Sequence, residues 1–294
     1  MKRAPGITFK RLYVEITNVC NLDCSFCPKT SRPPMFMEIE QFKKILDEVK
    51  EYSKYLYFHV MGEPLMHPEL GTFLDLCDEN DFKVNIVTNG TLIEEEKDKL
   101  LSKPALRAIS FSLHIFDKTT SIQKVDKYLD DIFEFITEAQ KRHTFFACLR
   151  LWNLNNKDTY YSYVLERIEK YFDYPHKIED IPYNGNDIKI RENIYVSQNL
   201  LFDWPNKDIP DINEDGFCLG LRKQAGILVD GTVVPCCLDS EGTIDLGNIN
   251  VSSFKEIIEG KRAENIYNGF SDRKAVESLC RKCGYRQRFS LKCP

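Results

Sequence analysis

The sequence lacks three features that would assign it to a broad class of proteins at once. No apolar stretch reaches the roughly 18 residues that a membrane-spanning helix needs. The basic N-terminus, residues 1–6, is not followed by the apolar run of a signal peptide. The net charge of −5 leaves no overall basic surface of the kind that binds whole nucleic acid. We therefore predict a cytoplasmic protein that does not act in a membrane and whose substrate is not intact tRNA or DNA.

What the sequence does contain is apolar material and cysteine. With 43% hydrophobic and 12% aromatic residues, the 294-residue chain can build a substantial core, and its length suits one large domain plus a small one. Eleven cysteines are present. In a reducing cytoplasm they would not form a disulfide framework. Ligation of a metal or a metal cluster is therefore the first hypothesis for those that lie close together in sequence.

Hydrophobic runs typical of strands and of helices alternate along the first 200 residues. Strands are predicted at 11–17, 55–61, 82–88, 107–113, 145–152 and 192–197, and helices at 38–52, 69–79, 93–103, 122–141 and 158–172. Each connection is long enough for a right-handed crossover, so the pattern predicts an α/β fold with a parallel sheet of six strands. Active sites of such folds lie at the carboxyl ends of the strands.

The alternation ends in a segment rich in proline, glycine and acidic residues, between about 182 and 217. This composition is typical of a surface connection. We therefore predict a core domain at 1–200, a linker at 201–217 and a small tail domain at 218–294. Within the tail, two short apolar runs on either side of Asp230-Gly231 predict a β-hairpin, and residues 252–268 are predicted to be helical.

Three cysteines follow the first predicted strand with the spacing C-x3-C-x2-C, at Cys20, Cys24 and Cys27. Iron–sulfur clusters are usually held by four thiolates, so three suggest a cluster with one iron open to a non-protein ligand. A zinc knuckle is the alternative, because C-x2-C spacing also suits zinc. The loop resembles the signature of the radical S-adenosylmethionine (radical SAM) superfamily, including Phe26 before the last cysteine.

That resemblance implies a fold, a cosubstrate and a partner. The fold is a partial (β/α)6 barrel with a small C-terminal domain of β-hairpin and helix. A [4Fe–4S] cluster on the three cysteines binds S-adenosyl-L-methionine (SAM) and cleaves it to a 5′-deoxyadenosyl radical. The chemistry needs an electron donor such as flavodoxin or ferredoxin.

Four more cysteines suggest a closed site in the tail: Cys218, Cys236, Cys280 and Cys283. By spacing alone, zinc and a cluster fit equally well. With Gly231 before Cys236 and a late C-x2-C, the tail resembles the Twitch or truncated SPASM extension of radical SAM enzymes. The resemblance implies one auxiliary [4Fe–4S] cluster, since Cys293 alone cannot supply a second. Cys237 competes with Cys236 as the ligand, and the spacing from Gly231 favours Cys236.

Further residues match family motifs at the predicted strand ends. The resemblance assigns cosubstrate contacts to Phe26, Gly62, Glu63, Pro64, Thr88, Asn89, Ser112, Arg150 and Asn153. Gly62-Glu63-Pro64 resembles the family's GGEP motif, which implies that Glu63 accepts hydrogen bonds from the SAM ammonium group. The alternative for Glu63 is a carboxylate that caps a helix N-terminus. Arg150 would meet the SAM carboxylate, because a buried arginine needs an anion.

Three residues are predicted to act on the substrate. His114 lies at the end of the fourth strand, where it would contact substrate or donate a proton, and its alternative is a core histidine. Lys29 and Arg32 follow the three cysteines and would bind an anionic group such as a phosphate, or else lie in a solvated loop.

The resemblance leaves the substrate open among several classes. A small tail, with no leader-peptide-binding module before the barrel, favours a small polar molecule such as a sugar or nucleotide. The specific candidate is a queuine lyase, which cleaves queuosine 5′-phosphate to release queuine. The alternatives are a sugar or cyclitol dehydrogenase that resembles the 2-deoxy-scyllo-inosamine enzyme, a ribosomal-peptide maturase, and a cysteine-rich zinc scaffold without enzyme activity.

Overall fold

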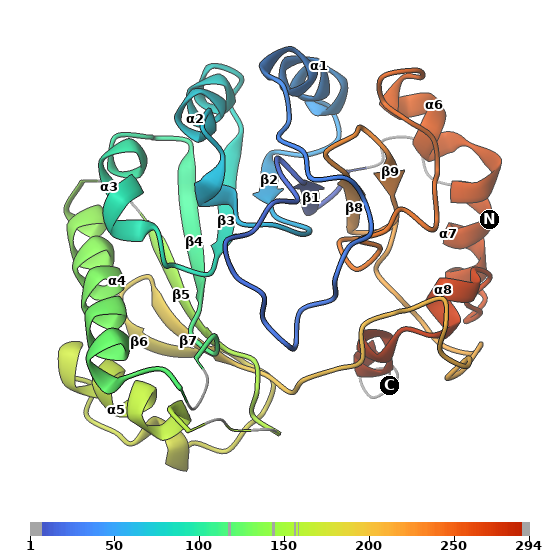
Figure 1. Cartoon of the computed structure of the whole chain (residues 1–294). Coiled ribbons are helices and arrows are strands. Elements are labelled where there is room, and N and C mark those ends of the chain that lie inside the picture. The colour runs from blue at the N-terminus through green and yellow to red at the C-terminus, as the bar shows by residue number, and fades with distance from the viewer. Residues whose placement is uncertain (1–7, 117–118, 143–144, 156, 158, 290–294) are drawn as a thin grey trace. The chain divides into compact units, whose positions relative to one another are not determined.

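Strands and helices alternate along the first 200 residues, as the hydrophobic pattern predicts (Figure 1). The structure is a computed structural model that describes residues 8–116, 119–142, 145–155, 157 and 159–289. The basic N-terminus at 1–6 and Cys293 lie outside these residues. The chain forms two compact units. The first unit holds Met1–Glu69, Glu79–Lys83 and Phe202–Pro294, and the second holds Leu70–Asp78 and Val84–Leu201.

The strands of the first unit join the start of the chain to its tail. Strand β1 (Arg11–Val14) pairs in parallel with β2 (Tyr55–Phe58) on one side and with β8 (Gln224–Ile227) on the other. Strand β9 (Val233–Val234) pairs antiparallel with β8 across the Asp230-Gly231 turn, so the predicted hairpin is confirmed. Its sequence did not reveal that β8 begins at Gln224 and extends the parallel sheet beside β1. The tail therefore shares a sheet with the first strand.

The second unit contains four more parallel strands, β3 (Lys83–Thr88), β4 (Leu106–Ser112), β5 (Phe146–Leu151) and β7 (Ile194–Gln198). All six strands predicted for the core are thus present. A further strand, β6 (Ile188–Arg191), pairs antiparallel with β7. It was not predicted, because glycine, asparagine and aspartate precede it and made the segment resemble a connection.

Amphipathic helices bury one face against the strands of each unit. In α1 (Ile39–Val49) the buried side chains are Phe42, Ile45, Leu46 and Val49, at helical spacing. The remaining long helices are α2 (Leu70–Glu79), α3 (Ile93–Leu101), α4 (Ile122–Arg142) and α5 (Tyr161–Tyr171). In Figure 1, α3, α4 and α5 lie along one side of the second-unit strands. The predicted helices of the core are confirmed, with ends that differ by a few residues.

The tail helix predicted at 252–268 is wrong in one respect, because it is two helices. Helix α6 (Phe254–Glu259) starts with a capping box between Ser253 and Glu256. Gly260 has extended backbone angles, and α7 (Lys261–Ser271) starts after it. The short elements η1 (Pro64–Met66), η2 (Ile178–Asp180), α8 (Ser278–Arg281) and η3 (Gly284–Phe289) complete the chain. No helix in the described ranges combines the length and apolarity needed to cross a bilayer.

Candidate active site and cluster sites

Residues 19–34 form a long loop between β1 and α1, which we call the cysteine loop because it carries Cys20, Cys24 and Cys27 (Figure 1). Its two ends are fastened together at the base. The Thr17 hydroxyl donates to the Met35 carbonyl at 2.8 Å. Asn18 accepts from the Met35 N–H at 2.7 Å and donates to the Pro33 carbonyl at 2.9 Å. These bonds join the two ends of the loop, although its backbone forms no helix or strand. The three thiols therefore extend from a base that hydrogen bonds hold in place.

The three cysteines differ in their exposure to solvent. Cys20 is exposed, whereas Cys24 and Cys27 are half-buried, and the Cys27 N–H donates to the Cys24 carbonyl at 3.2 Å. Burial raises the pKa of the Cys27 thiol to about 11, and the neighbouring Cys24 and Cys20 add to this shift. Cys20 and Cys24 lie close enough to raise the pKa of Cys27, and the loop is open to solvent at Cys20. This donor set fits a cluster with one open iron.

Gly62 and Glu63 lie directly under the cysteine loop. Gly62 has φ +76°, and a Cβ there would be 2.5 Å from the Thr17 carbonyl oxygen, so only glycine fits. The Glu63 N–H donates to the Val19 carbonyl at 2.8 Å. The Glu63 side chain is buried and caps η1, accepting from the Leu65 N–H at 3.0 Å. The capping alternative is therefore observed, and it leaves room for SAM binding because a carboxylate accepts several hydrogen bonds.

Lys29 and Arg32 are already engaged by carboxylates of the chain itself. Exposed Lys29 forms an ion pair with Asp23 in the same loop. Arg32 binds Glu15 with both terminal nitrogens, at 2.6 and 2.7 Å, and its side chain is 12% exposed. Arg32 therefore has a structural partner in place of the anionic substrate group that we predicted.

The second unit brings its predicted residues together at the carboxyl ends of neighbouring strands. Ser112 at the end of β4 is paired in register with Arg150 on β5. The Tyr128 hydroxyl donates to the carbonyls of Asn89 and Ser112, at 2.8 and 3.3 Å, which fixes the ends of β3 and β4 relative to each other. The Thr88 side chain accepts from the Gly90 N–H at 2.9 Å. Polar side chains from three strands therefore gather at one edge of this unit.

His114 and Asn153 are buried next to the same strand ends. His114 Nδ1 lies 3.2 Å from the Arg150 carbonyl oxygen. The Arg150 guanidinium stacks on the Trp152 ring with 3.8 Å to its centroid. Burial lowers the pKa of His114 to about 4, and the Arg150 charge contributes in the same direction. An imidazole with this pKa is neutral at pH 7, so it acts there through hydrogen bonding and does not donate a proton as an imidazolium.

The four predicted tail cysteines line a single cavity. Its volume is about 420 Å³ including its opening, and its lining includes Cys218, Cys236, Cys280 and Cys283. In the described part of the chain, no three Cys, His, Asp or Glu side chains converge on one ion position. Four thiols around a void instead match a cluster in which each thiolate binds a different iron. The donor set therefore fits an auxiliary [4Fe–4S] cluster.

Cys236 and Cys237 have different surroundings, which separates the two candidate ligands. Cys236 lines the tail cavity. Burial raises its pKa well above the usual value, and the three other cavity thiols add to this shift. Cys237 instead packs against a core cluster that includes Tyr13, Met61 and Leu228, and it forms a hydrogen bond with the Tyr13 side chain. The choice of Cys236 as the ligand therefore stays a prediction, which its place in the cavity lining favours.

Sequence reasoning missed a group of aromatic side chains beside the cysteine loop, which we call the aromatic face: Tyr13, Tyr57 and His59. The Tyr13 ring lies 5.3 Å from the Tyr57 ring and 5.1 Å from the His59 ring, between centroids. Cys27 and Tyr57 pack against the core cluster that contains Tyr13. The sequence carries a signal for this group, because alternate residues of adjacent parallel strands share a face.

The chain is similar to known proteins in sequence and in fold. A protein from Pyrococcus furiosus, described as a tungsten-containing aldehyde ferredoxin oxidoreductase cofactor-modifying protein, is 27% identical over 77% of this chain and 70% of its own length. The solved structure of BtrN in complex with AdoMet and 2-DOIA has a TM-score of 0.54 at 17% identity, over 94% of this chain and 92% of that one. Streptococcus suis SuiB bound to its precursor peptide SuiA has a TM-score of 0.59 at 16% identity, over 94% and 70%.

These structural similarities show the fold, and the family models show the family. The parallel strands and crossover helices match the partial-barrel architecture of these neighbours, so the predicted fold class is confirmed. Residues 218–284 match the SPASM iron–sulfur cluster-binding domain. Residues 14–174, more than half of the chain, match the radical SAM superfamily. The two domains imply a SAM-binding [4Fe–4S] cluster in the core and auxiliary iron–sulfur clusters in the tail. The chain belongs to the radical SAM superfamily of enzymes.

Proposed function

We propose that this enzyme abstracts a hydrogen atom from a small polar substrate, of the sugar or nucleotide class, that binds against the aromatic face. The position of that face is the observation that carries the proposal. Tyr13 and Tyr57 lie on adjacent parallel strands at paired register positions. Cys27 packs against the same core cluster as Tyr57. A substrate on this face would therefore lie close to the open iron.

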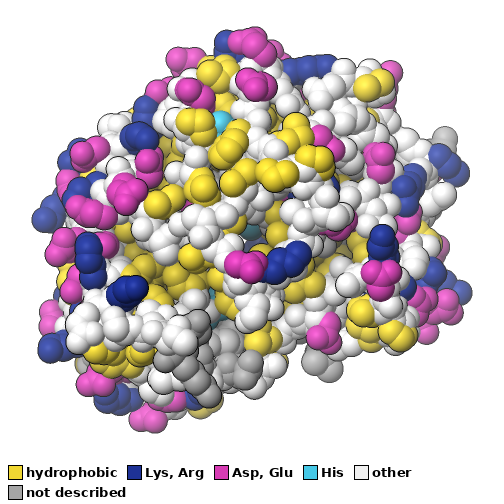
Figure 2. Space-filling view, viewed as in Figure 1, with side chains coloured by type: hydrophobic (Ala, Val, Ile, Leu, Met, Phe, Trp, Pro, Cys, Tyr) yellow, Lys and Arg dark blue, Asp and Glu magenta, His cyan; other side chains and the backbone are white. Residues whose placement is uncertain are grey.

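The chemistry of the aromatic face suits a nucleoside or sugar. Phenol and imidazole groups exchange hydrogen bonds with hydroxyl groups and ring nitrogens, and aromatic rings stack on bases. Tyr57 and His59 are half-buried. On the face shown in Figure 2, lysine and arginine side chains are interspersed with acidic ones and form no single basic patch. This distribution supports a small substrate over an intact nucleic acid.

Each part of the chain has its own task in the proposed reaction. The bound cluster and SAM supply the 5′-deoxyadenosyl radical that removes the hydrogen atom. We propose that the cysteine loop and Glu63 hold that pair. The contacts of Ser112 and Arg150 with the cosubstrate stay a prediction from the family resemblance. Members of this superfamily act on small molecules or peptides and need an external reductant. We propose flavodoxin or ferredoxin in that role.

The specific substrate that we propose is queuosine 5′-phosphate, with release of queuine. Anaerobically reconstituted enzyme, SAM and dithionite are incubated with this nucleotide, and queuine and 5′-deoxyadenosine are quantified. We expect the two products to accumulate in parallel. His59→Gln and Tyr57→Phe should raise KM, whereas Tyr52→Phe should not, because Tyr52 packs against Phe254 and lies outside the aromatic face. Cleavage of SAM without queuine release would eliminate this substrate.

A second candidate is oxidation of a sugar or cyclitol alcohol. The closed four-thiol cavity favours it, because a cluster without an open iron can accept the second electron of an oxidation. The experiment compares wild type with Cys280→Ala, supplied with candidate alcohols. An oxidase should lose ketone formation while still cleaving SAM. Unchanged product formation in Cys280→Ala would exclude an electron-accepting tail cluster.

A further inference from the structure

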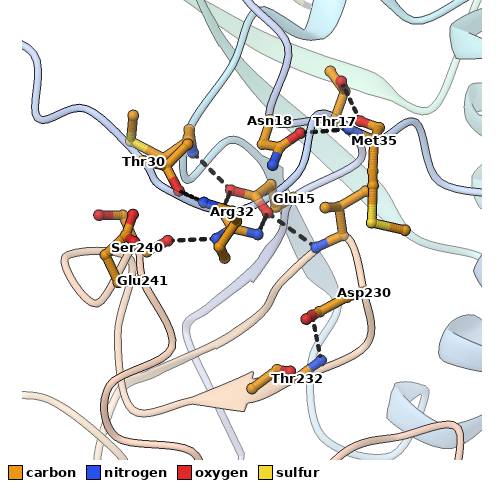
Figure 3. Close-up of polar contacts among 12 residues, drawn as sticks. Glu15, Thr17, Asn18, Thr30, Arg32, Met35, Asp230, Thr232, Ser240 and Glu241 are labelled. Atoms are coloured by element: carbon orange, nitrogen blue, oxygen red, sulfur yellow. Dashed lines mark hydrogen bonds and ion pairs between the residues drawn. The ribbon is translucent and has the colours of Figure 1, made fainter.

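Arg32 connects the two cysteine-bearing parts of the first unit. It lies five residues after Cys27, and its terminal nitrogens bind both oxygens of Glu15 at 2.6 and 2.7 Å. Its Nε donates to the Ser240 carbonyl at 2.8 Å. Ser240 lies four residues after Cys236, on the turn that follows the tail cavity. Figure 3 shows the guanidinium between Glu15 and the Ser240 turn. A single side chain therefore links the segments that follow the two cluster sites.

A second contact, between Ser31 and Glu241, lies beside the one that Arg32 makes with Ser240. The Ser31 N–H and hydroxyl both donate to the Glu241 carboxylate, with the hydroxyl at 2.6 Å. Burial opposes ionisation of Glu241, but hydrogen bonds from Ser31 and Thr30 outweigh it and lower the Glu241 pKa. Consecutive residues of the cysteine loop thus bind consecutive residues of the tail turn. We call this set the clasp: Glu15, Ser31, Arg32, Ser240 and Glu241.

Both sides of the clasp are anchored in rigid structure. Glu15 is 0% exposed, and it accepts from the Met61 N–H at 3.1 Å and from the Val229 N–H at 3.0 Å. The Glu15 carboxylate therefore joins the segments that follow β1, β2 and β8. On the tail side, buried Asp239 accepts from the Ile244 N–H at 2.7 Å and fixes the turn that presents Ser240 and Glu241. Neither end can shift without breaking buried hydrogen bonds.

The clasp is too elaborate to be explained by stability alone. Replacing a buried ion pair by apolar residues is often neutral or stabilising, so the Glu15–Arg32 pair is better explained by the geometry that it specifies. A bidentate arginine pair fixes both distance and orientation, which a lysine cannot do. The geometry specified here is that of the cysteine loop relative to the tail turn.

We propose that Arg32 is a positioning residue that holds the SAM-binding cluster at a fixed separation from the auxiliary cluster. The proposal does not depend on which substrate the enzyme uses. It predicts that loss of the clasp leaves both clusters loaded but changes the magnetic interaction between them.

The test uses dithionite-reduced, fully reconstituted enzyme and electron paramagnetic resonance. Wild type should show broadening of the SAM-bound cluster signal by the reduced tail cluster, and Cys280→Ala should remove that broadening. Arg32→Gln should alter it while iron analysis still gives about eight irons per chain, as two [4Fe–4S] clusters require. Arg32→Lys should restore it in part. Arg167→Gln is the matched control, because Arg167 binds Asp126 and Asp130 within the second unit only.

Two further variants separate positioning from folding. Glu15→Gln/Arg32→Gln removes the buried charges together, so it should fold better than Arg32→Gln alone and still show the altered broadening. Ser31→Ala disturbs only the outer contact, and a smaller change is expected. Broadening identical to that of wild type in Arg32→Gln and in the double variant would overturn the proposal. So would a wild-type signal without any broadening.

Discussion

The cysteine loop and the tail cavity hold thiols in opposite ways. The loop carries three cysteines on irregular backbone that is held at its base, by the clasp and by the packing of Cys27 against the core cluster, and Cys20 is exposed. The tail brings four cysteines from distant positions around one cavity, between β8, the segment after β9 and α8. The loop presents three thiols, one of them exposed, whereas four thiols line the cavity. From this difference we propose that the first set serves the site that reacts and the second set a site that is shielded.

Removing one cysteine from each region should produce the sharpest contrast. Cys24→Ala should abolish 5′-deoxyadenosine formation and leave about four irons per chain, because the closed site still holds its cluster. Cys280→Ala should also leave about four irons but retain SAM cleavage. Iron analysis and chromatography of 5′-deoxyadenosine check both. SAM cleavage by Cys24→Ala would show that the open site has been assigned to the wrong cysteines.

The two adjacent tail cysteines allow a finer test of the same contrast. Cys236 lines the cavity, whereas Cys237 forms a hydrogen bond with Tyr13. Cys236→Ala should therefore lose the auxiliary cluster, and with it about four irons per chain. Cys237→Ala should keep both clusters and change only substrate binding at the aromatic face. The reverse result, measured by iron and sulfide content, would exchange their roles.

The sequence predicted the two regions unequally. The local motifs predicted the strands correctly, because strand patterns depend on neighbouring residues. The roles of the cysteines and of Gly62-Glu63-Pro64 stay predictions. The role of Arg32 depends on Glu15 and Ser240, which lie 17 and 208 residues away, and no local pattern reveals such pairs. For the same reason the pairing of β8 with β1 could not be predicted from the tail alone. Both the partners of Arg32 and the pairing of β8 with β1 are contacts between segments that are distant in sequence.

Gly62 offers a way to loosen the loop without touching a cysteine. Gly62→Ala places a Cβ 2.5 Å from the Thr17 carbonyl oxygen at a positive φ. We expect a loss of about 3 kcal/mol in the free energy of unfolding, from backbone strain plus overpacking. Gly242→Ala is the matched control, since it has a similar φ of +66° but meets only side-chain atoms at 3.2 Å or more. Equal losses in urea unfolding would show that the close approach to Thr17 is unimportant.

The smallest effect is expected in the second unit, whose described residues include the buried His114. Burial lowers the pKa of folded His114 to about 4, whereas the unfolded chain takes up this proton near pH 6.5. Between these values the unfolded state binds more protons, so stability falls as the pH decreases. At pH 5 the loss is about 2 kcal/mol relative to pH 7.5, and it is complete only below about pH 4.

His114→Gln should remove that contribution without altering cluster loading. The measurement is urea unfolding of wild type and variant at pH 7.5 and pH 5, with other titrating groups cancelling in the comparison. We expect the variant to lose about 2 kcal/mol less on acidification than wild type does. An equal loss in both proteins would mean that His114 titrates normally. It would then be accessible to solvent and able to donate a proton as an imidazolium, which would restore the proton-donor role predicted from its place at the end of β4.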